Sequence, residues 1–134
     1  MKLEQELKTS KFSSEWHRAS LNILFTAYWL NDKVRHLLKP YGITAQQFNV
    51  LRILRGQYPN PLSTNEIRDR MLDRMPDTSR IVDRMHKQGL LQRGVCKSDK
   101  RLVDVCITDA GLKLLAEIDE KAGPNIENSL YGLT

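Results

Sequence analysis

The chain has 134 residues, 40% of them hydrophobic and 28% charged, which predicts one globular domain and excludes a disordered chain. Its longest nearly apolar run, residues 23–30, is far shorter than the roughly 20 residues of a membrane-spanning helix, and the amino terminus lacks an apolar signal segment, so we expect a cytoplasmic protein. The net charge of +5 is concentrated in residues 52–101, where twelve basic and six acidic residues give +6; a module that binds a polyanion has this distribution, although a solvated surface of mixed charge would give the same count.

Residues 12–39 carry apolar side chains at helical spacing with no proline or glycine between them, which predicts one long helix. Between Leu21 and Leu30, apolar residues occupy nearly every side of that helix, which is more than one buried face requires. We expect this stretch either to pack unusually deeply or to contact a partner subunit. Pro40 and Gly42 end the helix.

Three shorter helices are predicted from their starting residues. The first opens at a capping box of Thr44 and Gln47, and the second at a capping box of Ser63 and Glu66. The third has Pro76 in its first turn and runs to about residue 88. The second helix carries the apolar residues Ile67, Met71 and Leu72, and the residues expected to face inward on the other two are Phe48, Val50, Leu51, Leu54, Ile81, Val82 and Met85.

The period of the apolar residues changes after Gly89. The stretches LLQRGVC and RLVDVCIT have strand-like composition and predict a hairpin, with KSDK in a longer, wing-like loop. Thr108 then caps a last clear helix, which Pro124 interrupts before a short helical restart.

The two cysteines, Cys96 and Cys106, are too few for a disulfide scaffold and lack the spacing of a zinc site. A hairpin that turns after Asp99 places Cys106 opposite Arg93, about 10 Å along the strands from Cys96. A disulfide needs Cα atoms within about 7 Å, so none is expected between them. Basic neighbours favour a reactive thiolate at Cys96, although an inert thiol is the preferred interpretation.

The helices at 63–71 and 76–88 have the proportions of a helix-turn-helix, whose second helix reads DNA. We expect the first turns of this second helix to expose Thr78, Ser79, Arg80 and Arg84. Arginine can bond guanine through two hydrogen bonds in the major groove, and hydroxyls can bond bases or phosphates. Ordinary solvation of a helix surface is the alternative, and it is favoured for Asp83.

Three segments follow one another in a specific order: YGITAQQFNVLRIL, PLSTNEIRDRM and TSRIVDRMHKQGLLQRGVCKSDKRLVDVCITDAG. They cover most of residues 41–111 and end in a D-x-R wing motif and an I-T-x-x-G helix start. In this order they resemble the MarR-type winged helix-turn-helix transcription regulators. The resemblance implies a mainly α fold with a small β-hairpin wing, in which flanking dimerisation helices accompany the winged helix-turn-helix.

The resemblance also implies how the chain is organised and what it does. A single domain over residues 1–134 would have dimerisation helices at 1–41 and 108–134 around a DNA-binding lobe at 42–107. The protein would be a dimeric bacterial repressor or activator, with a repressor preferred, that binds a pseudo-palindromic operator in double-stranded DNA.

Individual positions carry the implied DNA interface. The family's recognition helix is matched by Thr78, Ser79, Arg80 and Arg84, and its wing by Asp99 and Arg101, where the arginine enters the minor groove and the acid helps to hold the wing. A narrow minor groove concentrates negative potential and so attracts a guanidinium group. Phosphate contacts are expected from Lys97 and Lys100 beside the wing arginine, and from the start of the preceding helix at Ser63, Thr64 and Asn65.

Many relatives bind a small phenolic or lipophilic effector in a cleft between the dimerisation helices and the DNA-binding lobe, and the candidates for lining it here are Trp16, His17, Trp29, His36 and Tyr41. Ordinary core or interface packing is the preferred alternative for each. Other relatives sense oxidants through a cysteine near the first helix, and no cysteine precedes Cys96.

Catalytic sequence patterns are absent: there is no nucleophile elbow, phosphate-binding loop or carboxylate pair, and the three histidines lack metal-ligand spacing. We therefore expect no enzymatic activity, cofactor or metal. The alternative to a DNA-binding regulator is a winged-helix module that binds proteins. The concentration of arginine in the recognition helix and wing favours DNA.

Overall fold

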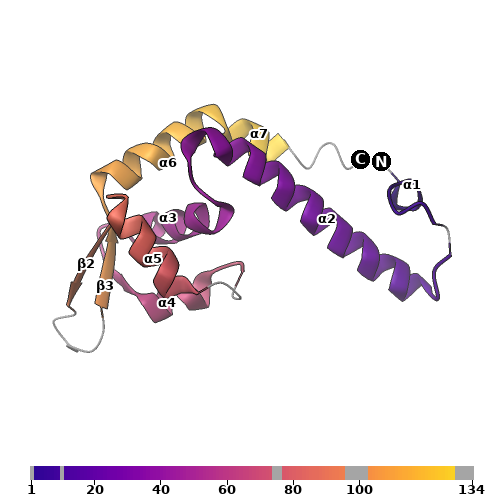
Figure 1. Cartoon of the computed structure of the whole chain (residues 1–134), viewed down its shortest axis with the longest axis horizontal. Helices are drawn as coiled ribbons and strands as arrows, with labels where there is room; N and C mark the ends of the chain where they lie inside the picture. The colour runs from indigo at the N-terminus through magenta and orange to yellow at the C-terminus, as the bar shows by residue number, and fades with distance from the viewer. Residues whose placement is uncertain (1, 10, 74–76, 96–102, 129–134) are drawn as a thin grey trace.

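Helices dominate the computed structural model, which describes residues 2–9, 11–73, 77–95 and 103–128. One long helix, α2 (Glu15–Leu38), projects from a lobe built of shorter helices and a hairpin (Figure 1). Among the described helices, none is both long and apolar enough to cross a membrane. The other elements are α1 (Leu3–Glu6), the 3-10 helix η1 (Lys39–Tyr41), α3 (Ala45–Gln57), β1 (Leu62–Ser63), α4 (Thr64–Arg70), α5 (Thr78–Lys87), β2 (Leu91–Val95), β3 (Val103–Ile107), α6 (Asp109–Lys121) and α7 (Gly123–Asn128).

The predicted long helix is confirmed as α2, with a later start. It begins at Glu15 rather than at Phe12, because the Ser14 hydroxyl accepts a 3.1 Å hydrogen bond from the His17 backbone N–H and caps the helix. Every residue of α2 is described, and only Leu38 at its end is buried. Most of the apolar surface of α2 is therefore left open by this single chain.

Both predicted capping boxes are present. At the start of α3, the Gln47 backbone N–H donates to the Thr44 hydroxyl and the Thr44 backbone N–H donates to the Gln47 side chain, each at 3.1 Å. At the start of α4, Ser63 and Glu66 exchange the equivalent bonds at 3.1 and 2.9 Å. Each box satisfies backbone donors that the first turn of a helix leaves free.

The second helix of the helix-turn-helix starts slightly later than predicted. Pro76 lies outside the described residues, and α5 begins at Thr78 after Asp77, whose side chain accepts a hydrogen bond from a backbone N–H of the first turn. The prediction that the preceding helix carries Leu72 is wrong, since α4 ends at Arg70 and the Leu72 side chain is 93% exposed. The chain becomes extended at Met71, with φ −70° and ψ 142°, so Leu72 no longer follows the helical stripe that buries Met71.

The hairpin belongs to a three-stranded antiparallel sheet in the order β1-β3-β2, and β1 was not predicted. The predicted pairing is wrong by one residue, because Cys106 lies opposite Gln92 rather than Arg93. The observed register pairs Leu91 with Ile107, both of which are buried. The predicted register would have paired Ile107 with a polar residue, so burial of the apolar face sets the register.

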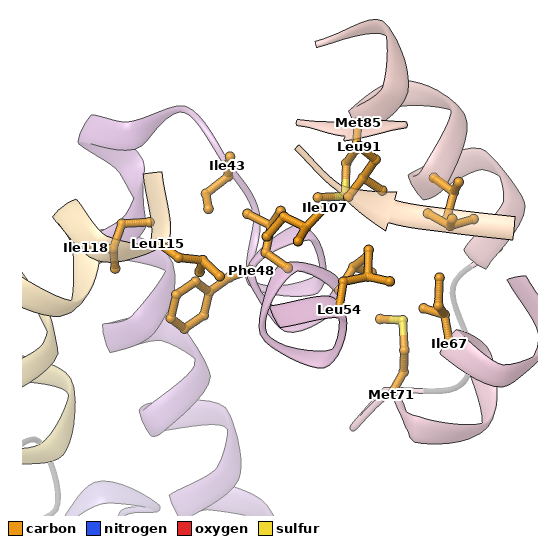
Figure 2. Packing of buried hydrophobic residues seen from close by; sticks show 14 of the residues in the cluster. Ile43, Phe48, Leu54, Ile67, Met71, Met85, Leu91, Ile107, Leu115 and Ile118 are labelled. Atoms are coloured by element: carbon orange, nitrogen blue, oxygen red, sulfur yellow. The ribbon is translucent and has the colours of Figure 1, made fainter. Parts of the chain in front are cut away.

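Helix α3 lies at the centre of the hydrophobic core. Figure 2 shows Phe48 of α3 facing Leu115 of α6, and Leu54 of α3 facing Met71 at the end of α4. Leu54 and Leu115 are at most 1% exposed. Burying a side chain of this size contributes about 1.5–3 kcal/mol to the free energy of folding. These contacts hold the helix-turn-helix on one side of α3 and α6 on the other.

Helix α6 is fixed to the lobe at its first turn and by an ion pair. As predicted, Thr108 caps α6, and its hydroxyl accepts a 3.1 Å hydrogen bond from the Gly111 backbone N–H. Only glycine fits at position 111, since an added Cβ would lie 2.6 Å from the Leu90 carbonyl oxygen. Further along α6, Asp119 accepts a 2.5 Å hydrogen bond from Arg55 of α3.

Candidate nucleic-acid interface

The outer face of α5 is polar and open to solvent. The Arg80 side chain is 88% exposed, Ser79 and Arg84 are exposed, and Val82 and Met85 on the inner face are buried. Arg80 and Arg84 are four residues apart, so their guanidinium groups extend from the same side of the helix. The predicted exposure of Ser79, Arg80 and Arg84 is therefore confirmed.

The predicted exposure of Thr78 is wrong. Thr78 is the first residue of α5 and only 4% exposed. It precedes Val82 by four residues and Met85 by seven, which places it on the inner stripe of the helix. Thr78 therefore belongs to the packing of α5 against the lobe rather than to a surface that reaches a base.

The three residues at the start of α4, where phosphate contacts are predicted, have different surroundings. Ser63 is buried and its hydroxyl is engaged in the capping box, so only the backbone amides at this end of α4 stay candidates for the predicted phosphate contact. Thr64 is half-buried. Asn65 is exposed and its side-chain oxygen accepts a 2.9 Å hydrogen bond from Arg68 one turn later, which gives α4 a solvent-facing amide beside a guanidinium group.

An ion pair between Asp83 of α5 and Arg93 of β2 joins the recognition helix to the first strand of the hairpin. The sequence predicts a solvated Asp83 and no ion-pair partner for Arg93. The sequence signal for this ion pair was a pair of opposite charges ten residues apart, on either side of a predicted helix-to-strand turn. The pair neutralises an acidic group on the helix that would otherwise repel phosphates.

The loop between β2 and β3 contains the predicted wing residues Lys97, Asp99, Lys100 and Arg101, and all four lie outside the described residues. The strands that lead into this loop pair from Leu91 with Ile107 to Val95 with Val103. These strands extend from the lobe on the side of α5 (Figure 1).

A groove of about 960 Å³ lies between α2 and the start of α3. It does not collect the five predicted effector residues, since His36 alone among them lines it. Residues 16 and 36 are twenty positions apart on one helix, which corresponds to about 30 Å, so Trp16 and His36 cannot share one small site within a single chain. Trp16 is exposed near the start of α2, and Tyr41 packs against the hydrophobic core.

The other two predicted effector residues have local contacts. The His17 ring meets Phe12 edge-on at 6.1 Å between centroids, and the Lys33 ammonium lies 4.5 Å from the Trp29 ring centroid. Such a cation–π contact at a helix surface contributes about 0.5–1 kcal/mol. These contacts support the local-packing interpretation of both residues.

Charged residues on α2 line one side of the groove. Asp32 accepts a 2.5 Å hydrogen bond from Arg35 and lies 3.7 Å from the His36 ring nitrogen. Sequence reasoning missed Asp32, Arg35 and Lys39, although their spacing of three, four and seven residues places them on one helix face with His36. The opposite side of the groove includes Ala45 and Asn49 of α3 and Leu72 after α4.

Comparison with known proteins identifies the family. A family model described as MarR family matches residues 41–102. The crystal structure of a MarR transcription factor from Planctomyces limnophilus is 32% identical in sequence and superposes with a TM-score of 0.77, over 91% of this chain and 87% of that chain. The chain belongs to the MarR family. The resemblance predicted from the sequence and the mainly α, winged helix-turn-helix fold class are both confirmed.

Other MarR-family similarities agree with this assignment. The HTH-type transcriptional repressor IacR of Pseudomonas putida is 27% identical over 117 residues, which cover 82% of this chain and 69% of that protein. A mutant of MarR from E. coli complexed with operator DNA has the same fold, with 23% identity and a TM-score of 0.77 over 90% of this chain and 85% of that chain. This MarR-family chain is a transcriptional regulator rather than an enzyme.

Proposed function

We propose that this MarR-family regulator binds a specific pseudo-palindromic operator as a homodimer and acts as a repressor. The observation that carries the proposal is the open face of α5, where Ser79, Arg80 and Arg84 are exposed on a helix whose opposite face is buried in the lobe. A helix of this kind fits the major groove, and arginine discriminates guanine there through paired hydrogen bonds. The operator complex of the E. coli neighbour supports the proposal, because it has the same fold.

The wing supplies the second part of the proposed interface. Arg101 enters the minor groove, Asp99 holds the wing, and Lys97 and Lys100 contact phosphates. Support comes from the position of β2 and β3, which lead from the lobe toward this loop on the side of α5 (Figure 1). Asn65 and Thr64 at the start of α4 add backbone and side-chain donors for a phosphate.

The homodimer is proposed from the open apolar face of α2. Ile23 is 70% exposed and Tyr28 is 71% exposed, and with Trp16 and Leu24 they follow one broad side of the helix. A second copy that covers this face would give two recognition helices, which can enter successive major grooves about 34–36 Å apart. Residues 1–41 and 108–134 would then form the dimerisation part and residues 42–107 the DNA-binding lobe.

The groove between α2 and α3 is the proposed effector site. It has room for a small aromatic molecule, with the Tyr28 ring and the cationic Arg35 and Lys39 on one side and Leu72 on the other. Because the groove borders both α2 and the helix-turn-helix, a bound molecule would shift the two parts relative to each other and release the operator.

Selection of bound duplexes from a random DNA pool tests the proposal. The expected product is a two-fold symmetric sequence that binds two chains, with an affinity that falls steeply as salt increases because several phosphates are contacted. Equal affinity for selected and random duplexes would overturn specific operator binding. Absence of DNA binding at low salt would favour a protein-interaction module instead.

A further inference from the structure

The turn of the helix-turn-helix is tied to α3 by one side chain. The Leu72 backbone N–H donates a 2.9 Å hydrogen bond to the Oδ1 atom of Asn49. Asn49 lies half-buried on α3, 23 residues before Leu72. Since α4 ends at Arg70 and α5 begins at Thr78, this bond holds the start of the connection between the two helices.

The bond does something that packing at this point does not. Met71 is buried and its backbone N–H donates a 3.3 Å hydrogen bond to the Arg68 carbonyl, so these contacts fix where α4 ends but do not hold the next residue. The Leu72 side chain adds no burial, being 93% exposed. The Asn49 oxygen therefore supplies the second fixed point, and two fixed points define the direction in which the chain leaves α4.

We propose that Asn49 is a positioning residue for operator recognition, which holds the start of the turn so that α5 presents Arg80 and Arg84 in one orientation. The inference rests on the proposed function, because a fixed orientation matters only if α5 reads DNA. Without the bond, the free protein would occupy several turn conformations and would lose affinity in proportion to the fraction that is competent to bind.

The same bond connects the groove to α5. Asn49, Leu72 and Asp73 all line the groove, together with Arg35 and Lys39 from the other side. A molecule in the groove that donates a hydrogen bond to the Asn49 oxygen would replace the Leu72 N–H and free the turn. An Asn49→Ala variant reproduces that freed state with no molecule bound.

Three variants test the positioning role. Asn49→Ala removes the acceptor, Asn49→Asp keeps a carboxyl oxygen at the same place, and Asn60→Ala makes the matched substitution at an exposed position between α3 and β1. Affinity is measured by fluorescence anisotropy for a duplex selected from the random pool and for a random duplex, at about 0.15 M salt, where charges farther apart than about 8 Å are largely screened.

We expect Asn49→Ala to bind the selected duplex about three- to tenfold more weakly than the parent, the range that one intramolecular hydrogen bond supplies. Its affinity for the random duplex should stay unchanged, because phosphate contacts do not depend on one orientation of α5. Asn49→Asp should recover most of the loss, and Asn60→Ala should match the parent. Amide hydrogen exchange at Leu72 should be faster in Asn49→Ala alone.

Two results would overturn the inference while the proposed function stands: an Asn49→Ala variant that keeps parental affinity for the selected duplex, or an Asn49→Asp variant as weak as Asn49→Ala. A circular dichroism spectrum like that of the parent shows that a weak variant is folded. A parent protein that does not prefer its selected duplex would overturn the proposed function and this inference with it.

Discussion

Arg93 of β2 pairs with Asp83 of α5, so the first strand of the wing and the recognition helix are held together by opposite charges. The Arg93 and Asp83 side chains are 39% and 49% exposed, which leaves their attraction open to screening by water and salt. The pair therefore adds little to the stability of the fold. It links two elements of the proposed DNA interface.

A double-mutant cycle with Asp83→Asn and Arg93→Gln measures this pair. We expect a coupling free energy below about 1 kcal/mol in urea unfolding, since exposed ion pairs contribute roughly 0.2–1 kcal/mol. The coupling should decrease further in 1 M salt. A coupling above about 2 kcal/mol that resists salt would contradict a solvent-screened pair.

Replacing Arg80 by alanine tests base reading by α5. Because Arg80 is exposed and its only described ion-pair contact is a 3.7 Å approach to Asp77, its removal should leave the fold intact. We expect a loss of about 1–3 kcal/mol for the selected duplex and a weaker preference at one base position, measured by repeating the selection with the variant. Lys11→Ala removes the same charge outside the lobe and serves as the control. Equal losses for the two variants would show that Arg80 acts only through its charge.

Three helix starts were predictable because their determinants are local. The capping boxes at Thr44 and Ser63 and the cap at Thr108 each use hydrogen bonds that span three residues, so the sequence alone contains all the participants. The apolar runs of α2 and α3 were equally clear. The strand register was not, because it depends on pairing Leu91 with Ile107 across a loop whose geometry the sequence does not encode locally.

The site was only partly predictable, for a related reason. Arg80 and Arg84 were identified by residue type and position, whereas the burial of Thr78 was missed although its spacing from Val82 and Met85 indicates the inner face of α5. The groove unites α2 with Asn49 and Leu72, which are separate in the sequence and meet only through the packing around α3. Tertiary contacts of this kind leave no periodic signal in one chain.

Thr108 joins two turns through one hydroxyl. Its oxygen accepts from the Gly111 N–H at 3.1 Å and its proton is donated to the Gly89 carbonyl at 2.7 Å. Thr108→Ala should lower the free energy of unfolding by about 1–2 kcal/mol, the usual cost of losing a helix cap. Thr108→Ser keeps both bonds and should stay within about 0.5 kcal/mol of the parent in urea unfolding at one protein concentration. A serine variant as unstable as the alanine variant would contradict the hydroxyl's role.

Cys106 should be a slow nucleophile. Burial and, secondarily, the negative charge of Asp104 raise the pKa of its thiol, so at a given pH less thiolate is present than in an ordinary cysteine. The alkylation rate by iodoacetamide should therefore rise only at higher pH than for a free cysteine. Cys106 is a free thiol, and its partner across the hairpin is Gln92. Gln92 lies four positions before Cys96 in the chain, so the expectation of no disulfide between the two cysteines remains.

The measurement uses a Cys96→Ser background, since Cys96 lies outside the described residues and would react independently. Adding Asp104→Asn removes the negative charge, lowers the thiol pKa and should move the rate curve to lower pH. If the alkylation rate of the Cys96→Ser protein depends on pH in the same way as that of free cysteine, burial does not raise the pKa of the Cys106 thiol.

The proposed homodimer depends on the apolar face of α2, and Ile23 lies on the exposed part of it. If a second copy covers this face, Ile23→Glu buries a carboxylate without a partner, which costs several kcal/mol and should convert the dimer to monomers at micromolar concentration. Sedimentation velocity measures the change directly. Gln57→Glu adds the same charge at an exposed position of α3 and should leave the assembly unchanged. The same sedimentation coefficient for parent and Ile23→Glu would place the interface elsewhere, whereas a monomeric parent would contradict the dimer itself.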